Sequence, residues 1–208
     1  MTKQKNQPRW TAKGNFGYFR SEKKRRTLVT AALFAGPLIV LISAWIYYKT
    51  RLNVWTVLAV VSSLPGCRSL VNLIMLLRCR SMDPELYQEI HDHQGNLTMA
   101  YEMYMTFYEK SAYVDAFAVC GNSVVLFSSD TKTDASYIAE NAQKILRGNG
   151  YKADVKLLKE KKAFLERLDS MNRHQDSLRE GILFTPDEKY PDLSREELIR
   201  HTLLALCL

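Results

Sequence analysis

Two apolar runs separated by only five residues constrain this chain more than any other feature of its sequence. Residues 27–48 contain no charged side chain, and residues 54–77 contain only one, Arg68. A membrane-spanning helix needs about 20 apolar residues, because roughly 30 Å of hydrocarbon is crossed at about 1.5 Å per residue. Both runs reach that length, and neither has the polar face that is usual for a core helix. The sequence therefore predicts a transmembrane helical hairpin over residues 27–80.

Basic residues set the expected orientation of this hairpin. The tail 1–26 has nine Lys and Arg residues against one acid, and two arginines follow the second run. The turn between the runs has only Lys49 and Arg51. Short segments rich in Lys and Arg stay in the cytoplasm. We therefore expect a multi-pass protein of the cell membrane with both termini in the cytoplasm.

The net charge of +7 is concentrated in the part of the chain near the membrane. Residues 1–26 contribute +8, residues 27–81 contribute +5 and residues 82–208 contribute −6. Each Lys or Arg near an anionic membrane adds about 1 kcal/mol of attraction, so the basic balance indicates lipid headgroups and not nucleic acid. The side chains expected at the membrane surface are Trp10, Lys23, Lys24, Arg25, Arg26, Arg78 and Arg80. A tail that only sets the topology is an alternative that the sequence leaves open.

Arg68 is the single charge inside the second run. It lies nine residues before the end of the run at Leu77, or roughly 13 Å at 1.5 Å per residue, and close to the centre of the run. Exposure of such a charge to lipid costs at least about 2.5–3.5 kcal/mol, and intramembrane ionisable residues usually face a partner or water. Neither run contains an acid to pair with it.

Three interpretations of Arg68 remain open, and Pro65 separately predicts a kink in the helix nearby. Water or a lipid phosphate reaches Arg68 at a break in the helix. Alternatively, Arg68 faces another subunit or an acidic helix of a different membrane protein. In the third interpretation the membrane-spanning part ends early, and residues 68–80 continue along the interface. We expect a kinked helix in which Arg68 binds a partner or a lipid headgroup.

Residues 81–208 predict one small cytosolic domain. Asp83-Pro84-Glu85 is typical of a helix start, and a helical pattern continues to Tyr108, with a candidate interruption at Gly95-Asn96. Two β-branched and aromatic runs then flank Gly121-Asn122, which predicts a hairpin with a type II′ turn. A helix over 133–147, capped by Gly148, completes the first part of the domain.

The last part of the chain predicts a strand and two more helices. ADVKLL is a short strand, KKAFLERLDSMNRH is a helix, and a capping box at Ser194 opens a final apolar helix. The expected fold class is α+β, with a short antiparallel or mixed sheet of three strands packed by helices. The four cysteines have no metal-site spacing and indicate reduced thiols, so we expect no metal and no cofactor.

One group of charged residues in this domain is a candidate active site. Pairing along the predicted hairpin sets Asp115 opposite Ser128 and places Asp130 on the same face, which Lys132 continues. An acid on one strand followed by D-x-K on the next resembles the PD-(D/E)xK nuclease core, over roughly residues 97–158. That resemblance implies that the two aspartates hold Mg²⁺ or Mn²⁺ and that the lysine stabilises developing charge. Members of that family have three strands before the second helix, where this sequence predicts two.

Two functions of different classes therefore fit the sequence. The first is a bacterial-type integral membrane protein that displays a cytosolic interaction or regulatory domain and has no recognisable catalytic site. Its partners would be anionic lipid and a membrane protein, a cytosolic protein or a second copy of the chain. The alternative is a membrane-tethered, divergent PD-(D/E)xK-like nuclease that depends on Mg²⁺ or Mn²⁺. Whether the domain has enzymatic activity is left open.

Overall fold

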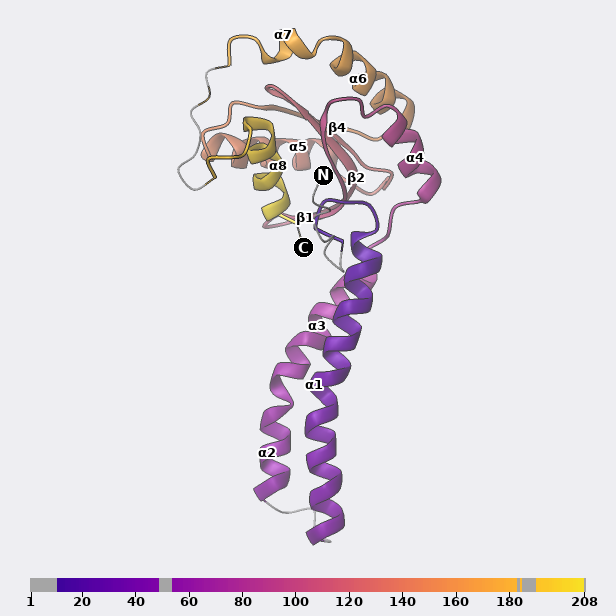
Figure 1. The fold of residues 1–208 in the computed structure, drawn as a ribbon, viewed down its shortest axis with the longest axis vertical. Helices are drawn as coiled ribbons and strands as arrows, with labels where there is room; N and C mark the ends of the chain where they lie inside the picture. The colour runs from indigo at the N-terminus through magenta and orange to yellow at the C-terminus, as the bar shows by residue number, and fades with distance from the viewer. Residues whose placement is uncertain (1–10, 49–53, 183, 185–189, 208) are drawn as a thin grey trace, which may run out of the picture. The chain divides into compact units, whose positions relative to one another are not determined.

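The computed structural model describes residues 11–48, 54–182, 184 and 190–207 (Figure 1). The chain divides into two compact units. One unit is the continuous stretch Phe19–Arg80, and the other combines Ser81–Leu208 with the segment that ends at Tyr18.

The first unit is a hairpin of two long helical arms. Helix α1 (Tyr18–Tyr48) forms one arm, and helices α2 (Val54–Ser62) and α3 (Leu64–Arg78) form the other. Both arms are long and apolar enough to cross a membrane. Their apolar side chains are largely exposed, for example Ile39 at 66% and Val57 at 64%. A continuous apolar surface of this kind marks a site of contact with lipid or protein.

The second arm breaks at Ser63, where the position of Pro65 predicts a kink. Pro65 lies in the first turn of α3, where its missing N–H costs no hydrogen bond. The hydroxyl of Ser63 donates to the carbonyl of Val60 at 2.7 Å, and that of Ser62 donates to Ala59 at 3.0 Å. The same two carbonyls also accept from the N–H of Ser63, at 3.1 Å for Val60 and 3.2 Å for Ala59, so backbone and side-chain donors share them at the break.

The second unit is built on a four-stranded mixed sheet. Its strands are β1 (Thr98–Thr106), β2 (Ser111–Cys120), β3 (Ser123–Phe127) and β4 (Asp154–Leu158), in the order β1-β2-β3-β4. Strand β2 is antiparallel to both β1 and β3, and β4 is parallel to β3.

The helix predicted to continue to Tyr108 is therefore wrong, and the sheet has four strands where three were predicted. Helix α4 (Pro84–Asp92) is followed by a turn at Gly95, whose φ is +53°. Residues 98–106 are strand β1. This strand is buried on both faces, so it reads as a continuous Met- and Tyr-rich run that periodicity does not distinguish from a helix.

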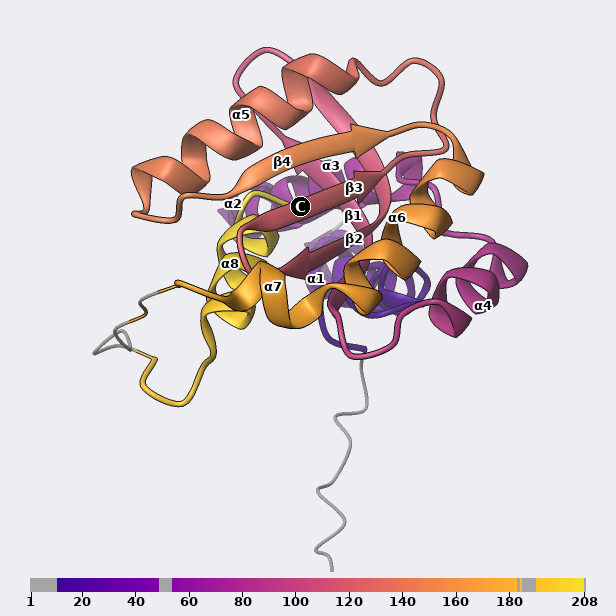
Figure 2. The ribbon, with the colours of Figure 1, turned by 90° about the horizontal axis from the view of Figure 1, so that it is seen from above.

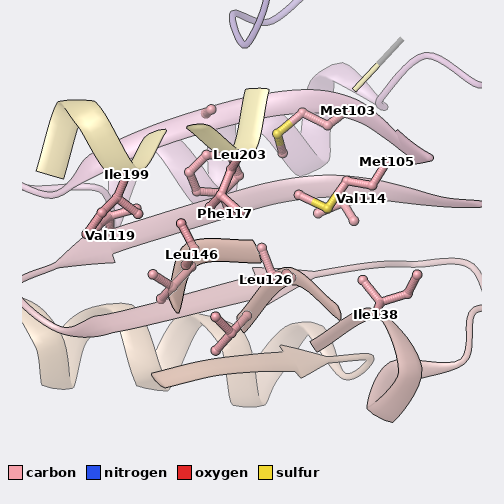
Figure 3. Close-up of a cluster of buried hydrophobic side chains, with 14 of the residues drawn as sticks. Met103, Met105, Val114, Phe117, Val119, Leu126, Ile138, Leu146, Ile199 and Leu203 are labelled. Atoms are coloured by element: carbon pink, nitrogen blue, oxygen red, sulfur yellow. The ribbon is translucent and has the colours of Figure 1, made fainter. Parts of the chain in front are cut away.

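Helices cover both faces of the sheet, which makes three layers (Figure 2). Helices α5 (Ala135–Gly148) and α8 (Arg195–Ala205) pack on one face, and α4 and α6 (Lys161–Arg173) pack on the other. The short helix α7 (Gln175–Arg179) follows α6. Figure 3 shows the α5/α8 core, in which Phe117 and Leu126 from the sheet meet Leu146 and Ile199 from the helices.

Most predicted local signals of this unit are confirmed. The β2–β3 hairpin turns at Gly121, with a φ of +56°, while Asn122 keeps a negative φ, as a type II′ turn requires. Asp83 accepts from the N–H of Glu85 at the start of α4, and the capping box at Ser194 is formed. The end of α5 differs slightly, because its C-cap is Asn149 and not Gly148.

The outer edge of β1 is covered by two segments, one around Gly14 and one just after α8. The carbonyl of Gly14 accepts from the N–H of Tyr101 at 2.9 Å, and the carbonyl of Leu206 accepts from the N–H of Thr106 at 3.1 Å. Gly14 has a φ of +84°, and an added Cβ would lie 2.9 Å from a methyl group of Leu204. Covering an edge strand in this way blocks its pairing with other chains. The apolar C-terminal end is thus docked on its own domain.

Candidate functional site

The buried polar side chains of the second unit lie together at one level of the sheet. Among the described residues of this unit they are Glu102 (2% exposed), Asp115 (2%), Ser128 (0%) and Thr133 (5%). We call these four residues the polar row. The strand register places Glu102 on β1 opposite Asp115 on β2, and its continuation past β3 places Ser128 opposite Asp115.

Both strands are distorted where the two carboxylates face each other. Tyr101 and its partner Ala116 point into the α4/α6 core, while Met103 and its partner Val114 point into the α5/α8 core. Regular alternation would send residues two positions apart to the same face. Each strand therefore changes faces at its carboxylate, at Glu102 in β1 and at Asp115 in β2, and Glu102 is the one non-glycine residue with a positive φ, +52°, among the described residues. Backbone in this region costs of order 1–3 kcal/mol.

The polar row satisfies backbone groups at the ends of neighbouring elements. Glu102 Oε1 accepts from the N–H of Met82, just before α4, at 3.0 Å. Asp115 Oδ2 accepts from the N–H of Ser129 at 2.6 Å, just after β3. Ser128 Oγ donates to the carbonyl of Tyr113 at 2.5 Å and lies 3.3 Å from Thr133 Oγ1. The row thereby fixes where the strands end.

The three residues of the nuclease resemblance fall in different surroundings. Asp115 belongs to the polar row, but the β3-side position opposite it carries the hydroxyl of Ser128. Asp130 Oδ1 accepts from the N–H of Lys132 at 3.0 Å and closes the turn before α5. Within the described parts of the chain, no three His, Cys, Asp or Glu side chains gather in a way that could hold a metal ion.

Lys132 lines a separate hollow of about 440 Å³ next to Lys110 and Asp134. The ammonium of Lys110 lies 2.8 Å from Asp134 Oδ2. This bond and the N–H of Tyr137 hold the pKa of Asp134 at about 2. Asp134 is thus a fixed anion that caps α5.

Sequence reasoning missed a second polar group, centred on Glu196 at the start of α8. Arg179 donates from Nε to Oε1 and from Nη2 to Oε2 of Glu196, both at 2.9 Å. The N–H of Gly121 in the hairpin turn also donates to Oε1 at 2.8 Å. Burial alone would raise the pKa of Glu196, but the bonds from Arg179 and Gly121 outweigh it and lower the pKa. No local motif announces this contact, because the three partners are far apart in the sequence.

Arg195 holds the same turn from the other side. Its guanidinium donates to the carbonyl of Gly121 at 2.7 Å and to Asn122 Oδ1 at 2.6 Å. A cavity of about 480 Å³ lies beside this group and is lined in part by Thr98, Ile182 and Phe184. The β2–β3 turn is thereby fastened to α8 by both a cation and an anion.

In the hairpin unit, direct contacts fix how the two arms are aligned. Thr30 Oγ1 lies 2.7 Å from Ser69 Oγ, and Lys23 Nζ donates to the carbonyl of Cys79 at 2.7 Å. Phe34 packs on Gly66, where an added Cβ would lie 3.2 Å from the ring. Arg68 is exposed and makes no hydrogen bond or ion pair with any described residue.

The described residues among those predicted at the membrane surface lie near one end of the hairpin. Lys24, Arg78 and Arg80 are exposed there. The other cations are engaged: Arg25 and Arg26 pair with Glu22 at 2.5 and 2.9 Å, and Lys23 binds the carbonyl of Cys79. Trp10 and the turn residues Lys49 and Arg51 lie outside the described residues.

The polar groups of the domain and the cations of the hairpin differ in what they can do chemically. The oxygens of the polar row and of the Glu196 group accept hydrogen bonds from backbone and guanidinium donors within the domain. Buried polar groups stabilise a fold in this way. The exposed cations of the hairpin are available to an external anion. Neither a family model, nor a curated protein, nor a solved structure matches this chain, so its contacts and chemistry are what point to a function.

Proposed function

We propose that this chain is an integral membrane protein whose helical hairpin anchors an α+β interaction or regulatory domain at the cytoplasmic face of the membrane. The observation that carries the proposal is the contrast in exposed apolar surface. Large apolar side chains are exposed along both arms of the hairpin, whereas Tyr108 is the one exposed large hydrophobic residue among the described residues of the other unit. Lipid is the environment in which the hairpin surface is stable.

The charge distribution supports the orientation. Exposed cations gather at the end of the hairpin where α1 begins and α3 ends. The positive-inside rule assigns that end to the cytoplasm. The domain is joined to the same end, at Tyr18 and Ser81, and so belongs to the cytoplasmic side.

An interaction role suits a domain whose buried polar groups serve its own fold. Tyr108, at the turn between β1 and β2, is fully exposed. Exposed aromatic residues are frequent anchors in protein interfaces. Tyr108 is therefore the first side chain to examine for partner contact.

Topology reporters on the full-length chain test this proposal directly. Fluorescent protein fused after Leu208 is expected to fluoresce, and alkaline phosphatase at the same position is expected to be inactive, because the former works in the cytoplasm and the latter only outside. The protein is also expected to resist alkaline carbonate extraction. Release by carbonate would sink the membrane anchor, and active phosphatase would overturn the orientation.

A nuclease is the second candidate, and one specific observation favours it. Helix α4, three antiparallel strands, helix α5 and the parallel strand β4 follow one another in the order that the PD-(D/E)xK resemblance requires, including the strand that the sequence prediction lacked. The site residues fit the implied Mg²⁺ or Mn²⁺ poorly. The β3-side position opposite Asp115 carries the hydroxyl of Ser128, and Asp130 closes a turn. We therefore derive no reaction through a metal.

Calorimetry of the full-length protein in detergent with MnCl₂ separates the two candidates. The interaction proposal expects no saturable heat. Saturable binding that Asp115→Asn abolishes would favour the nuclease, provided that Asp154→Asn keeps it. Asp154 is a suitable control because it is an exposed carboxylate on β4, paired loosely with Lys156 at 3.6 Å.

A further inference from the structure

The alignment of the two arms shows which residues of α1 lie beside Arg68, and the sequence alone does not. Ser69 contacts Thr30 across the hairpin, and Gly66 contacts Phe34. Arg68 therefore lies beside the stretch from Thr30 to Phe34, close to its Thr30 end. Arg26, the last cation of α1, precedes Thr30 by four residues, which is about 6 Å along a helix that rises about 1.5 Å per residue.

The depth of Arg68 below the cytoplasmic interface is therefore smaller than the depth obtained by counting residues back from Leu77. That count assumes that the apolar run ends where the membrane ends. In the structure, Cys79 at the end of α3 contacts Lys23, so the residues from Leu73 to Arg78 run beside the charged first turns of α1. The last part of the second run therefore lies alongside cations, and Arg68 is about one turn away from them.

We propose that Arg68 binds the phosphate of a phospholipid in the cytoplasmic leaflet, with Asn72 as a second donor. This inference rests on the proposed membrane anchor and names its partner. Asn72 is four residues further along α3, on the same side of the helix and one turn closer to the cytoplasmic end. Both side chains are exposed.

The geometry and charge of the site match a phosphate. A guanidinium presents planar paired donors that suit phosphate oxygens, and hydrogen bonds between such charged groups are among the strong ones. A depth of about 6 Å is within reach of an arginine, whose stem lies in the apolar layer while its head extends to the interface. Arg68 lies on the exposed surface of the hairpin, where lipid has access.

The other occupants considered for Arg68 fit less well. A second copy of the hairpin offers no carboxylate, because residues 27–80 contain no acid. Glu22, the nearest acid in the same unit, is already bound by Arg25 and Arg26. An acidic helix of another protein would have to bring a carboxylate to this level, whereas the lipid headgroups next to it already carry phosphate.

Depth measurement by spin labelling tests the inference, because Cys67 is exposed and adjacent to Arg68. The three other cysteines are buried and are replaced by alanine. The protein is labelled at Cys67 and reconstituted in vesicles of phosphatidylcholine with a minor fraction of phosphatidylglycerol. A matched variant carries Val60→Cys with Cys67→Ala, two turns away towards the hairpin turn and about 10 Å deeper at 1.5 Å per residue.

Collisions with oxygen and with a water-soluble nickel chelate report the depth of each label. We expect the label at Cys67 about one helical turn below the phosphate level and the label at position 60 about 10 Å deeper still. A Cys67 label at the bilayer centre would overturn the phosphate site but leave the membrane anchor standing. Two labels that are equally open to the nickel chelate would overturn the anchor as well.

Replacement of Arg68 then tests whether its charge sets the depth. Arg68→Leu is expected to move the Cys67 label deeper by about 3 Å, the rise of two residues, while Arg68→Lys keeps it in place. Leu70→Ala, an exposed apolar position on the same helix, is the control and is expected to cause no shift. An unchanged depth in Arg68→Leu would contradict phosphate binding by this residue.

Discussion

The hairpin and the domain of this chain differ in where they place their large apolar side chains. The domain places large side chains such as Phe117 and Phe164 inside two cores, one on each face of its sheet. The hairpin buries small residues such as Ala59 and Gly66 and leaves many large side chains exposed, such as those of Ile39 and Val57. Small residues let helix backbones approach closely where lipid removes the hydrophobic drive to associate. The difference is what the proposed membrane anchor requires, because each unit would then fold in a different solvent.

The largest expected effect comes from truncation of a core side chain in the domain. Phe117→Ala should lower the free energy of unfolding of the domain by about 3–5 kcal/mol, through lost burial and a residual cavity. Urea unfolding of the full-length protein in detergent, followed by circular dichroism, measures the change. Leu64→Ala, which is 63% exposed in the hairpin, is the matched control and should leave the domain transition unchanged. Equal losses would break the contrast between the units.

The Glu196 group is expected to contribute next. Glu196→Gln removes the charge from hydrogen bonds with Arg179 and Gly121, so the domain should lose about 1.5–3 kcal/mol of unfolding free energy. Urea unfolding measures the loss, and Glu140→Gln on the exposed side of α5 serves as the control. A loss no larger than the control's would show that this group does not fasten the turn.

The same group predicts a pH dependence. Its folded-state pKa is lowered, so its stabilisation is present above the unfolded value of about 4.3 and is lost as the pH falls through the folded value. The domain should therefore become less stable on acidification below about pH 4.5. Glu196→Gln should reduce this dependence in unfolding curves recorded across that range. Identical slopes in both proteins would contradict the assignment.

The polar row should contribute a somewhat smaller amount. Asp115→Ala leaves the N–H of Ser129 without its acceptor, which should cost about 1–3 kcal/mol of domain stability. Asp115→Asn keeps an acceptor oxygen and should cost less. Thermal unfolding of both variants measures which one loses more stability. A larger loss in Asp115→Asn than in Asp115→Ala would contradict this expectation.

The smallest effect is expected in the hairpin. Ser69→Ala removes the hydrogen bond to Thr30, and such bonds between membrane helices average about 0.6 kcal/mol. The loss should therefore be well below that of the domain variants. Steric-trap unfolding in bicelles measures it, and Ser43→Ala, whose hydroxyl bonds only within α1, is the control. A loss above that of Glu196→Gln would reverse the comparison between the units.

Local chemistry explains which parts of the fold could be predicted from sequence. The helix starts at Asp83 and Ser194 and the turn at Gly121 depend on neighbouring residues, and all three are as predicted. Strand β1 was missed because a strand buried on both faces loses the alternation that identifies strands.

The sites were harder to predict than the fold. Glu196 acquires its role only when Arg179 and Gly121 are brought to it by the folded chain. The level of Arg68 likewise depends on which residue of the other arm lies beside it. Long-range pairing of this kind leaves no local signal, and the roles proposed for Asp115, Asp130, Lys132 and Arg68 stay predictions.

The hydrogen bond between Gly14 and Tyr101 has a consequence for how the protein is made. Gly14 leaves the ribosome before the hairpin, and Tyr101 leaves after it, so the domain closes only once the hairpin between them has been synthesised. The hairpin is thus an insertion into a domain and not an anchor added to its end. A fragment that begins after the hairpin would lack the segment that covers β1, and its exposed edge would be free to pair with other copies.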